Sequence, residues 1–405
     1  MSVNGWKEVV LNEVVDKLGD GLHGTPKYDD NGDYYFVNGN NLQGEIVFNE
    51  KTKKVDEVEY QKYKKDLNNT TLLVSINGTL GNVATYNGEK IILGKSACYF
   101  NVSENVDKNF IKYIIISDFF KEYIQGYSTG TTIKNIGLKQ MRNFKFFLPP
   151  LQEQKAIAAT LSCLDDKIEL NNRMNQTLEE MAQAIFKSWF VDFEPFQDGE
   201  FVDSELGRIP KGWRVGELGE FLENIKASVK ANPNINGVPY VPIDTISKYS
   251  LGLRDFKSGK EAKSSLISFL KDDILIGAMR VYFHKVAIAP FDGITRTTCF
   301  VLRSKQSFFL SYSLLLCNTD DLIEYANKTS KGSTMPYAIW KGGIQQYKIV
   351  IPTNDVLQKF HYLLYPVLVK IRDGLFENQK LKQLRNTLLP KLMSGEVRVP
   401  IPEAE

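Results

Sequence analysis

Three short motifs resemble parts of known catalytic sites, and each lacks a feature that its chemistry requires. Gly94-Lys95-Ser96 resembles the end of a phosphate-binding loop, but Glu89 occupies the position of that loop's first glycine. Pro149-Pro150 is flanked by leucines, whereas the methyltransferase motif has a polar residue before its prolines and an aromatic residue after them. Asp165-Asp166-Lys167 resembles the end of a nuclease site, but the chain has no Pro-Asp partner for it. The sequence therefore predicts no catalytic site.

Basic and polar side chains in turn-rich segments indicate contacts with DNA instead. Lysine and arginine bind phosphates and supply affinity, whereas hydroxyl, amide and guanidinium groups read base edges. The candidates in the first half of the chain are His23, Thr25, Lys27, Tyr28, Asn38, Asn40, Asn41, Lys53, Lys54, Thr131, Thr132 and Lys134. Those in the second half are Lys226, Ser228, Lys230, Arg280, Tyr282, His284, Lys285, Arg296, Thr297, Lys331, Ser333 and Thr334. A surface lysine is more often only solvated, and His23 and His284 are more often structural, so loop positions that recur in both halves are the stronger candidates.

The composition is that of an ordinary globular protein with more than one domain. The 405 residues are 43% hydrophobic and 24% charged. The net charge is only +2, so a DNA-binding surface must come from local clustering of charge. The N-terminus has no signal-peptide pattern, and no apolar run reaches the roughly 18 residues of a membrane-spanning helix. We therefore expect a soluble protein that does not associate with a membrane.

The cysteines and histidines form no metal-binding pattern. The cysteines are Cys98, Cys163, Cys299 and Cys317, without a CxxC pair, and only three histidines are present. Zinc sites need clusters with short ligand spacing, so we expect no metal and no other cofactor on this chain. Unpaired thiols in a chain without a signal peptide indicate the reducing cytoplasm.

The chain repeats itself at an offset slightly above 200 residues. Each half has about 140 residues of short strand-like runs broken by turns, with one amphipathic helix predicted near 109–125 and its counterpart near 307–327. A proline then closes the segment and a long helical pattern follows. The matching segments are Gly5-Trp6-Lys7 with Gly212-Trp213-Arg214, Tyr35-Phe36-Val37-Asn38 with Tyr240-Val241-Pro242-Ile243, Cys98 with Cys299, Ser128-Thr129-Gly130 with Ser330-Lys331-Gly332, and Phe144–Pro149 with Tyr347–Pro352.

The two long patterns have the spacing of coiled-coil helices. Apolar residues recur at alternating intervals of four and three, as at Ile157, Leu161, Leu164 and Ile168 and again at Leu364, Val367 and Ile371. Such a stripe could pack on its own domain, but two long copies with asparagine at the same position favour an antiparallel pair. The aromatic run 185–193 exceeds what a two-helix seam can bury, which predicts a surface for a partner protein.

Several segments of these helices resemble the conserved regions of the specificity subunits of type I restriction-modification systems. Leu148–Gln154 and Leu164–Asn171 are similar to the family's first conserved region, and Leu388–Glu396 is similar to the second. Ser204–Trp213 resembles the family's entry into a second recognition domain. The resemblance covers the whole chain in architecture and is specific as a combination of motifs.

The resemblance implies an α+β fold with two pseudo-symmetric α/β target-recognition domains, separated by a pair of long antiparallel coiled-coil helices. The expected divisions are 1–148 for the first recognition domain, 149–195 for the first spacer helix, 196–352 for the second recognition domain, and 353–405 for the second spacer helix and C-terminal tail. Each recognition domain would read one half of a split target in double-stranded DNA, and the helices would set the spacing between the halves.

The same resemblance implies the partners. Two methyltransferase subunits would dock on the helices, bind S-adenosylmethionine and flip the target adenine out of the duplex. Two restriction/translocase subunits, driven by ATP with Mg²⁺, would cut unmethylated DNA. The chain itself would be non-catalytic.

Two other functions remain open at this point. A stand-alone DNA-binding scaffold or repressor would lack methyltransferase partners, and a neighbouring gene for an adenine methyltransferase would distinguish it. A self-sufficient nuclease or methyltransferase would show activity as an isolated chain.

Overall fold

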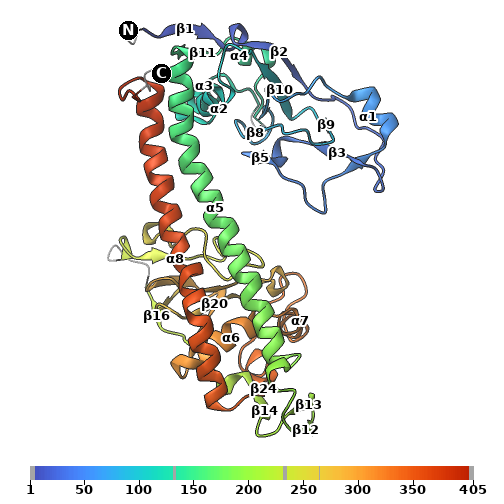
Figure 1. The fold of residues 1–405 in the computed structure, drawn as a ribbon, viewed down its shortest axis with the longest axis vertical. Coiled ribbons are helices and arrows are strands. Elements are labelled where there is room, and N and C mark those ends of the chain that lie inside the picture. The colour runs from blue at the N-terminus through green and yellow to red at the C-terminus, as the bar shows by residue number, and fades with distance from the viewer. Residues whose placement is uncertain (1–4, 131–133, 231–234, 264, 401–405) are drawn as a thin grey trace. The chain divides into compact units, whose positions relative to one another are not determined.

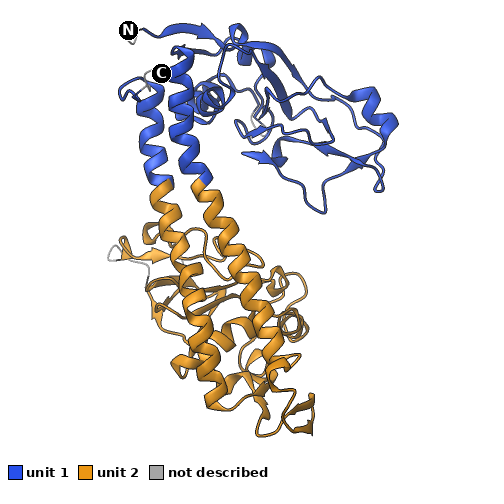
Figure 2. Cartoon of the chain, viewed as in Figure 1, with its two compact units in different colours: residues 1–166, 382–405 blue, residues 167–381 orange. Residues whose placement is uncertain are grey.

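The computed structural model describes residues 5–130, 134–230, 235–263 and 265–400. The chain divides into unit 1, residues 1–166 and 382–405, and unit 2, residues 167–381 (Figure 2). Each unit contains a β-rich domain and part of two long helices, α5 (Leu151–Phe190) and α8 (Asn354–Met393), which are labelled in Figure 1. This mixed α+β architecture confirms the predicted fold class.

Unit 1 is built on a four-stranded antiparallel sheet in the order β2-β10-β7-β8. Helices α2 and α3 cover one face of this sheet, and the small sheet β6-β3-β9 packs on the other. The elements are β1 (Lys7–Val10), β2 (Val15–Asp20), β3 (Tyr34–Val37), β4 (Leu42–Gln43), β5 (Glu45–Ile46), β6 (Lys54–Val55), α1 (Glu57–Tyr63), β7 (Thr71–Ser75), β8 (Val83–Thr85), β9 (Ile91–Leu93), β10 (Ala97–Val102), α2 (Lys108–Ile116), α3 (Asp118–Tyr127), α4 (Leu138–Arg142) and β11 (Lys145–Leu148).

Unit 2 repeats this plan, with a four-stranded antiparallel sheet in the order β15-β23-β20-β21. Just as β1 pairs with β11 in unit 1, β14 pairs with β24 in unit 2. The elements are β12 (Phe201–Ser204), β13 (Gly207–Pro210), β14 (Arg214–Glu217), β15 (Leu222–Asn224), β16 (Ser228–Val229), β17 (Pro239–Tyr240), β18 (Lys257–Ser258), β19 (Leu266–Phe269), β20 (Ile274–Gly277), β21 (Val286–Ile288), β22 (Gly293–Arg296), β23 (Cys299–Ser304), α6 (Leu310–Cys317), α7 (Asp320–Lys328) and β24 (Lys348–Ile351).

The register of the two sheets corrects one sequence match. Ala97 pairs with Ser75 in unit 1, and Cys299 pairs with Gly277 in unit 2. Cys299 is therefore the counterpart of Ala97, at an offset of 202, and not of Cys98. Alternate residues of a strand face opposite sides of a sheet, so the two cysteines enter different cores: Cys98 faces α2 and α3, whereas Cys299 faces the opposite side.

The single helix predicted in each half is two helices. Ser117 separates α2 from α3, and its hydroxyl accepts a hydrogen bond from the backbone of Phe120 at 3.3 Å. Thr319 separates α6 from α7 and accepts from the backbone of Leu322 at 3.4 Å. Both residues have extended backbone angles and act as N-caps. The prediction of one helix was wrong because the apolar periodicity continues through these caps.

Helices α5 and α8 pack through the predicted seam. Within unit 2, Asn171 lies against Asn378 and Asn175 lies against Ile371, so the residue numbers rise on one helix as they fall on the other. The pair is therefore antiparallel. A side chain at Gly374 would meet the Asn175 amide at 2.6 Å, which explains a glycine within the stripe.

The aromatic rings at the end of α5 are buried or half-buried in the core of unit 2, so they do not form the partner surface that their number suggested. Phe186 and Phe190 belong to the core of unit 2. The ring of Phe190 lies 4.7 Å from that of Phe360 on α8 and 4.8 Å from that of Tyr312 on α6. The run is longer than a two-helix seam requires because it also packs on the second domain.

The buried asparagines of the seam form a defined polar contact. Asn171 donates to the Asn378 side chain at 2.9 Å, and Asn378 donates to the Asn172 side chain at 2.9 Å. We expect Asn171→Leu to destabilise the chain by about 1–3 kcal/mol, because it leaves a buried amide unsatisfied. The double variant Asn171→Leu with Asn378→Leu should recover most of the lost stability, but its two helices should pair in a less strictly defined register. Urea unfolding followed by circular dichroism measures both, with the exposed Gln176→Ala as control. An unaltered midpoint in the single variant would contradict this contact.

In the described residues, no helix has both the length and the apolar character needed to cross a membrane.

Candidate nucleic-acid interface

The clearest feature that both units share outside their sheets is a pair of loops held together by backbone hydrogen bonds. Loop A follows the central strand β7 or β20 and comprises residues 76–82 in unit 1 and 278–285 in unit 2. Loop B follows the helix pair and comprises residues 129–135 and 331–337. Polar groups in loops on a rigid sheet are a common basis for recognition.

The same backbone bonds fix the two loops in both units. In unit 1, the backbone N–H of Ile136 donates to Ile76 at 3.0 Å, and that of Gly78 donates to Lys134 at 2.9 Å. The bonds in unit 2 run from Ala338 to Ala278 at 2.9 Å and from Arg280 to Pro336 at 2.8 Å, each 202 positions later at both ends. A shared bonding pattern at one constant offset shows that these loops are structural counterparts.

Backbone hydrogen bonds join the two ends of loop B in both units. Thr129 and Asn135 exchange two backbone hydrogen bonds of 2.9 Å, and Lys331 and Tyr337 exchange bonds of 2.9 and 2.8 Å. Gly130 and Gly332 adopt a positive φ, of 98° and 93°, which favours glycine. The exposed candidates on these turns are Lys134, Lys331, Ser333 and Thr334, whereas Thr131 and Thr132 lie outside the described residues.

The asparagines at the end of β3 serve mainly to shape their own loop. The Asn38 side chain accepts from the Ser96 hydroxyl at 2.8 Å, and Asn41 donates to the backbone of Val47 at 2.9 Å. The Asn41 side chain also accepts from the Asn38 backbone at 3.0 Å. Asn40 is exposed, and its side chain is the best placed of the three to meet a base.

The other candidates of unit 1 lie on exposed segments. His23 pairs with Asp20, Lys53 lies 3.9 Å from Asp30, and the Lys54 ammonium lies 5.3 Å from the centre of the Tyr35 ring. Carboxylate partners lower the electrostatic attraction of a cation for phosphate. Three further candidates are exposed: Thr25, Lys27 and Tyr28.

In unit 2, loop A carries two of the candidates at its surface and two in its interior. Tyr282 is exposed and Arg280 is partly buried. His284 is buried, with ring nitrogens 3.0 Å from the Asn318 side chain and 3.2 Å from the Asp320 carboxylate. Lys285 donates to the backbone of Ile243 at 2.6 Å, and burial lowers the pKa of its ammonium group.

Other candidates of unit 2 lie outside these loops, and one of them, Thr297, contacts loop B. Tyr337 of loop B donates its hydroxyl to the backbone carbonyl of Thr297, which joins loop B to the β22–β23 turn. Burial raises the pKa of Tyr337 to about 12, so the hydroxyl stays protonated as a donor. The exposed candidates here are Lys226, Ser228, Lys230, Arg296 and Thr297.

Two surface features escaped the sequence reasoning. Loop A of unit 1 has exposed Gly78 and Thr79, but shares no recognisable sequence with its counterpart in unit 2. Only the shared backbone bonding pattern reveals the correspondence. Tyr249 is 67% exposed, has a left-handed backbone (φ 51°), and places its ring 4.5 Å from that of His284. An isolated tyrosine in a polar loop gave no signal of this arrangement.

The structure shows no site for nucleotide chemistry at the motifs that suggest one. Gly19–Gly24 has the glycine spacing of a dinucleotide-binding loop, but no helix follows it between residues 21 and 33. Ile91–Leu93, before Gly94-Lys95-Ser96, is a buried strand. No group of His, Cys, Asp and Glu in the described ranges has the geometry to hold a metal ion.

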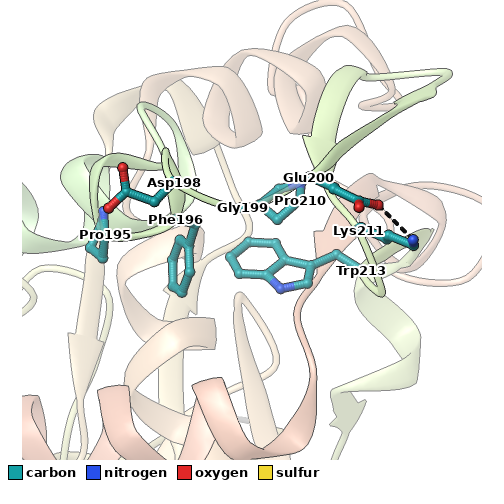
Figure 3. A pocket seen from close by; sticks show the side chains of 8 residues that line it. All are labelled: Pro195, Phe196, Asp198, Gly199, Glu200, Pro210, Lys211 and Trp213. Carbon is teal, nitrogen blue, oxygen red and sulfur yellow. Dashed lines mark hydrogen bonds and ion pairs between the residues drawn. The ribbon is translucent and has the colours of Figure 1, made fainter.

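A pocket of about 560 Å³ lies between residues 195–200, which follow α5, and residues 210–213, which precede β14 (Figure 3). An ion pair between Lys211 and Glu200, with 2.6 Å between nitrogen and oxygen, borders it, and the Trp213 and Phe196 rings form its apolar part. None of its lining residues comes from loop A or loop B. The lining residues are Pro195, Phe196, Asp198, Gly199, Glu200, Pro210, Lys211 and Trp213.

A duplicated β-rich domain with matched surface loops and a helix pair defines a two-domain recognition protein. A family model described as "Type I restriction modification DNA specificity domain" matches residues 4–180 and again residues 210–371. The chain therefore belongs to the family of type I restriction-modification specificity subunits. This membership confirms the prediction of a non-catalytic DNA specificity subunit, whose catalytic steps reside on other subunits of its system.

Known relatives agree with this assignment. The specificity subunit of the type I restriction enzyme MjaIX of Methanocaldococcus jannaschii is 31% identical over 314 residues, which are 73% of this chain and 70% of the relative. The HindI specificity subunit of Haemophilus influenzae is 23% identical over 363 residues, covering 71% of this chain and 77% of the relative. The crystal structure of the S subunit from M. genitalium has a similar fold, with a TM-score of 0.58, 20% identity and 96% coverage of both chains.

Proposed function

We propose that each unit reads one half of a split target in double-stranded DNA through its loops A and B. This proposal rests on one observation: the same backbone hydrogen bonds join loops A and B in both units, at a constant offset of 202 residues. Two copies of one reading surface suit two half-sites. The recognition domains would correspond to residues 1–148 and 196–352, and segments 149–195 and 353–405 would be spacers.

The exposed side chains of each loop pair have suitable chemistry for this role. Lys134 and Lys331 would bind phosphates, and Ser333, Thr334 and Tyr282 would bind sugars, phosphates or base edges. The remaining exposed candidates would extend the contact along the duplex. Phosphate contacts set the position of a protein on DNA, whereas base contacts set its specificity.

The outer faces of α5 and α8 would bind two methyltransferase subunits. Leu170 and Met181 on α5 are 53% and 51% exposed, and Leu384 and Leu363 on α8 are each 48% exposed. Met181 and Leu384 lie 203 positions apart, the offset of the two helical patterns, as expected for two equivalent partners. The partners would bind S-adenosylmethionine and methylate adenine, and two ATP-driven restriction/translocase subunits would complete the complex in the cytoplasm. Exposed apolar side chains on helices favour this role over a stand-alone repressor.

Salt dependence tests the proposal. The complex of the full chain with its methyltransferase subunits should bind its target with an affinity that falls linearly on a log–log plot against salt, by about 0.9 per phosphate contacted. Lys331→Ala should lower the slope by about one. Lys359→Ala is the control, because this α8 residue pairs with Asp355 at 2.8 Å. A slope near zero for the unaltered complex would exclude the DNA-reading role of the loops.

A further inference from the structure

Loop A of unit 2 has a strained backbone where loop A of unit 1 does not. Arg280 and His284 have positive φ angles of 52° and 50°. Their counterparts in unit 1 are Gly78 and Gly81, with φ angles of 79° and 82°. The offset rises from 202 to 203 within the loop, because Val83 pairs with Val74 whereas Val286 pairs with Ile276. A side chain at a left-handed position costs free energy that glycine avoids.

The His284 side chain has partners that explain why this position is not glycine, whereas the Arg280 side chain has no such partner among the described residues. The His284 ring is buried and bonded to Asn318, and it lies within ion-pair distance of Asp320. The Nε of Arg280 is buried, and within the described part of the chain it has no hydrogen-bond partner. No carboxylate in those same ranges forms an ion pair with this guanidinium. A buried donor without an acceptor is unfavourable, so strain and an unsatisfied donor coincide at one residue.

Two hydrogen bonds fix the backbone of Arg280. Its N–H donates to Pro336 of loop B at 2.8 Å, and its carbonyl accepts from Phe283 at 2.9 Å. Tyr282 on loop A and Lys331 on loop B are exposed. Sparsely populated backbone conformations persist mainly where function requires a fixed orientation.

We propose that Arg280 is a base-reading residue of unit 2 and that it contacts a guanine in the major groove. This inference rests on the proposed function of the loops. The arginine fork matches the O6 and N7 acceptors of guanine. A phosphate contact would not need a strained, partly buried position, since a flexible exposed lysine suffices. Gly78 has no side chain for this contact, so the two units read their half-sites differently.

The test uses the full chain in complex with its methyltransferase subunits and a target defined by the host's adenine methylome. Each guanine in the half-site of unit 2 is replaced in turn by 7-deazaguanine, which pairs normally but lacks N7. The wild-type complex should lose roughly tenfold or more in affinity at one position. Arg280→Ala should lose about ten- to hundredfold on the intact target and nothing further at that position.

Two variants separate reading from charge and from folding. Arg280→Lys keeps the charge but not the planar fork, so it should bind the intact target more weakly than the wild type and lose less affinity than the wild type when N7 is removed. Arg280→Gly should have a melting temperature no lower than that of the wild type, because φ 52° suits glycine.

Three results would overturn the inference: a half-site without guanine, a wild-type complex insensitive to every replacement, or full recovery by lysine. If the wild-type complex cannot distinguish its target from a scrambled duplex, the proposed function itself fails.

Discussion

Exchange of residues 1–148 for the corresponding segment of a relative should change one half of the methylated target and leave the other half intact. The two domains have separate cores: the four-stranded sheet of unit 1 packs with α2 and α3, and that of unit 2 packs with α6 and α7. Specific binding commonly exceeds non-specific binding by about 10³-fold or more. Methylation of the original target should therefore fall to background, and a new hybrid target should appear in the adenine methylome.

The first domain must keep its contacts with the helices for this exchange to succeed. The Trp6 indole donates to Glu153 of α5 at 3.1 Å, and Arg398 donates to the same carboxylate at 2.8 Å. Glu153 is almost fully buried, so loss of Trp6 removes a partner from a buried charge. The donor segment should therefore carry tryptophan at this position, and a Trp6→Phe chain with the native domain serves as stability control. Alteration of both half-sites by the exchange would contradict independent reading.

The repeat and the long helices could be predicted because each is a periodic signal. The heptad spacing correctly predicted buried residues of α5, among them Ile157, Leu161 and Asn171. The match of Trp6 with Trp213 also holds, because each precedes a strand that pairs with the last strand of its domain. Periodicity over tens of residues leaves little room for an error of register.

The errors arose where the signal was short or local. Matching Cys98 with Cys299 shifts the alignment of the two strands by one residue, which assigns each side chain to the wrong face of its sheet. A short strand sequence does not contain enough residues to reveal such a shift. Ser117 and Thr319 end one helix and begin the next through capping bonds, which the apolar pattern does not report. The burial of Phe190 depends on Tyr312, which is distant in the sequence.

The candidate DNA-reading residues could be predicted only as chemical types. Asn38 and Asn41 have amides of the kind that can read adenine. In the structure these amides are hydrogen-bonded to Ser96 and to the backbone of Val47, so they stabilise their own loop. Conversely, Arg280 gains its significance from a backbone angle and an unsatisfied nitrogen, neither of which a sequence displays. Loop A of unit 1 emerged only from the shared bonding pattern.

The second large effect should come from the length of the helix pair. Helices α5 and α8 each contribute residues to both units, so we expect them to set the spacing between the half-sites. Insertion of four helix-forming residues after Asn172 and four after Phe376, which leaves Asn171 and Asn378 on the same side of both insertions, should lengthen both helices by about 6 Å, at roughly 1.5 Å per residue. B-DNA advances about 3.4 Å per base pair. The methylome of this variant should therefore show the same half-sites separated by about two more base pairs.

Insertion of two residues at the same positions is the matched comparison. Four residues turn a helix by about 40° beyond one full turn, so the apolar seam remains nearly aligned at 3.6 residues per turn. Two residues turn it by about 200°, which moves the residues beyond the insertion, including Asn175 with its contact to Ile371, out of the seam. We expect this variant to expose apolar side chains and to lose methylation entirely, because the two helices no longer pair along their length. If instead the four-residue variant methylates the original target with its original spacing, then the helices do not determine the separation, and flexible linkage of the recognition domains must account for it.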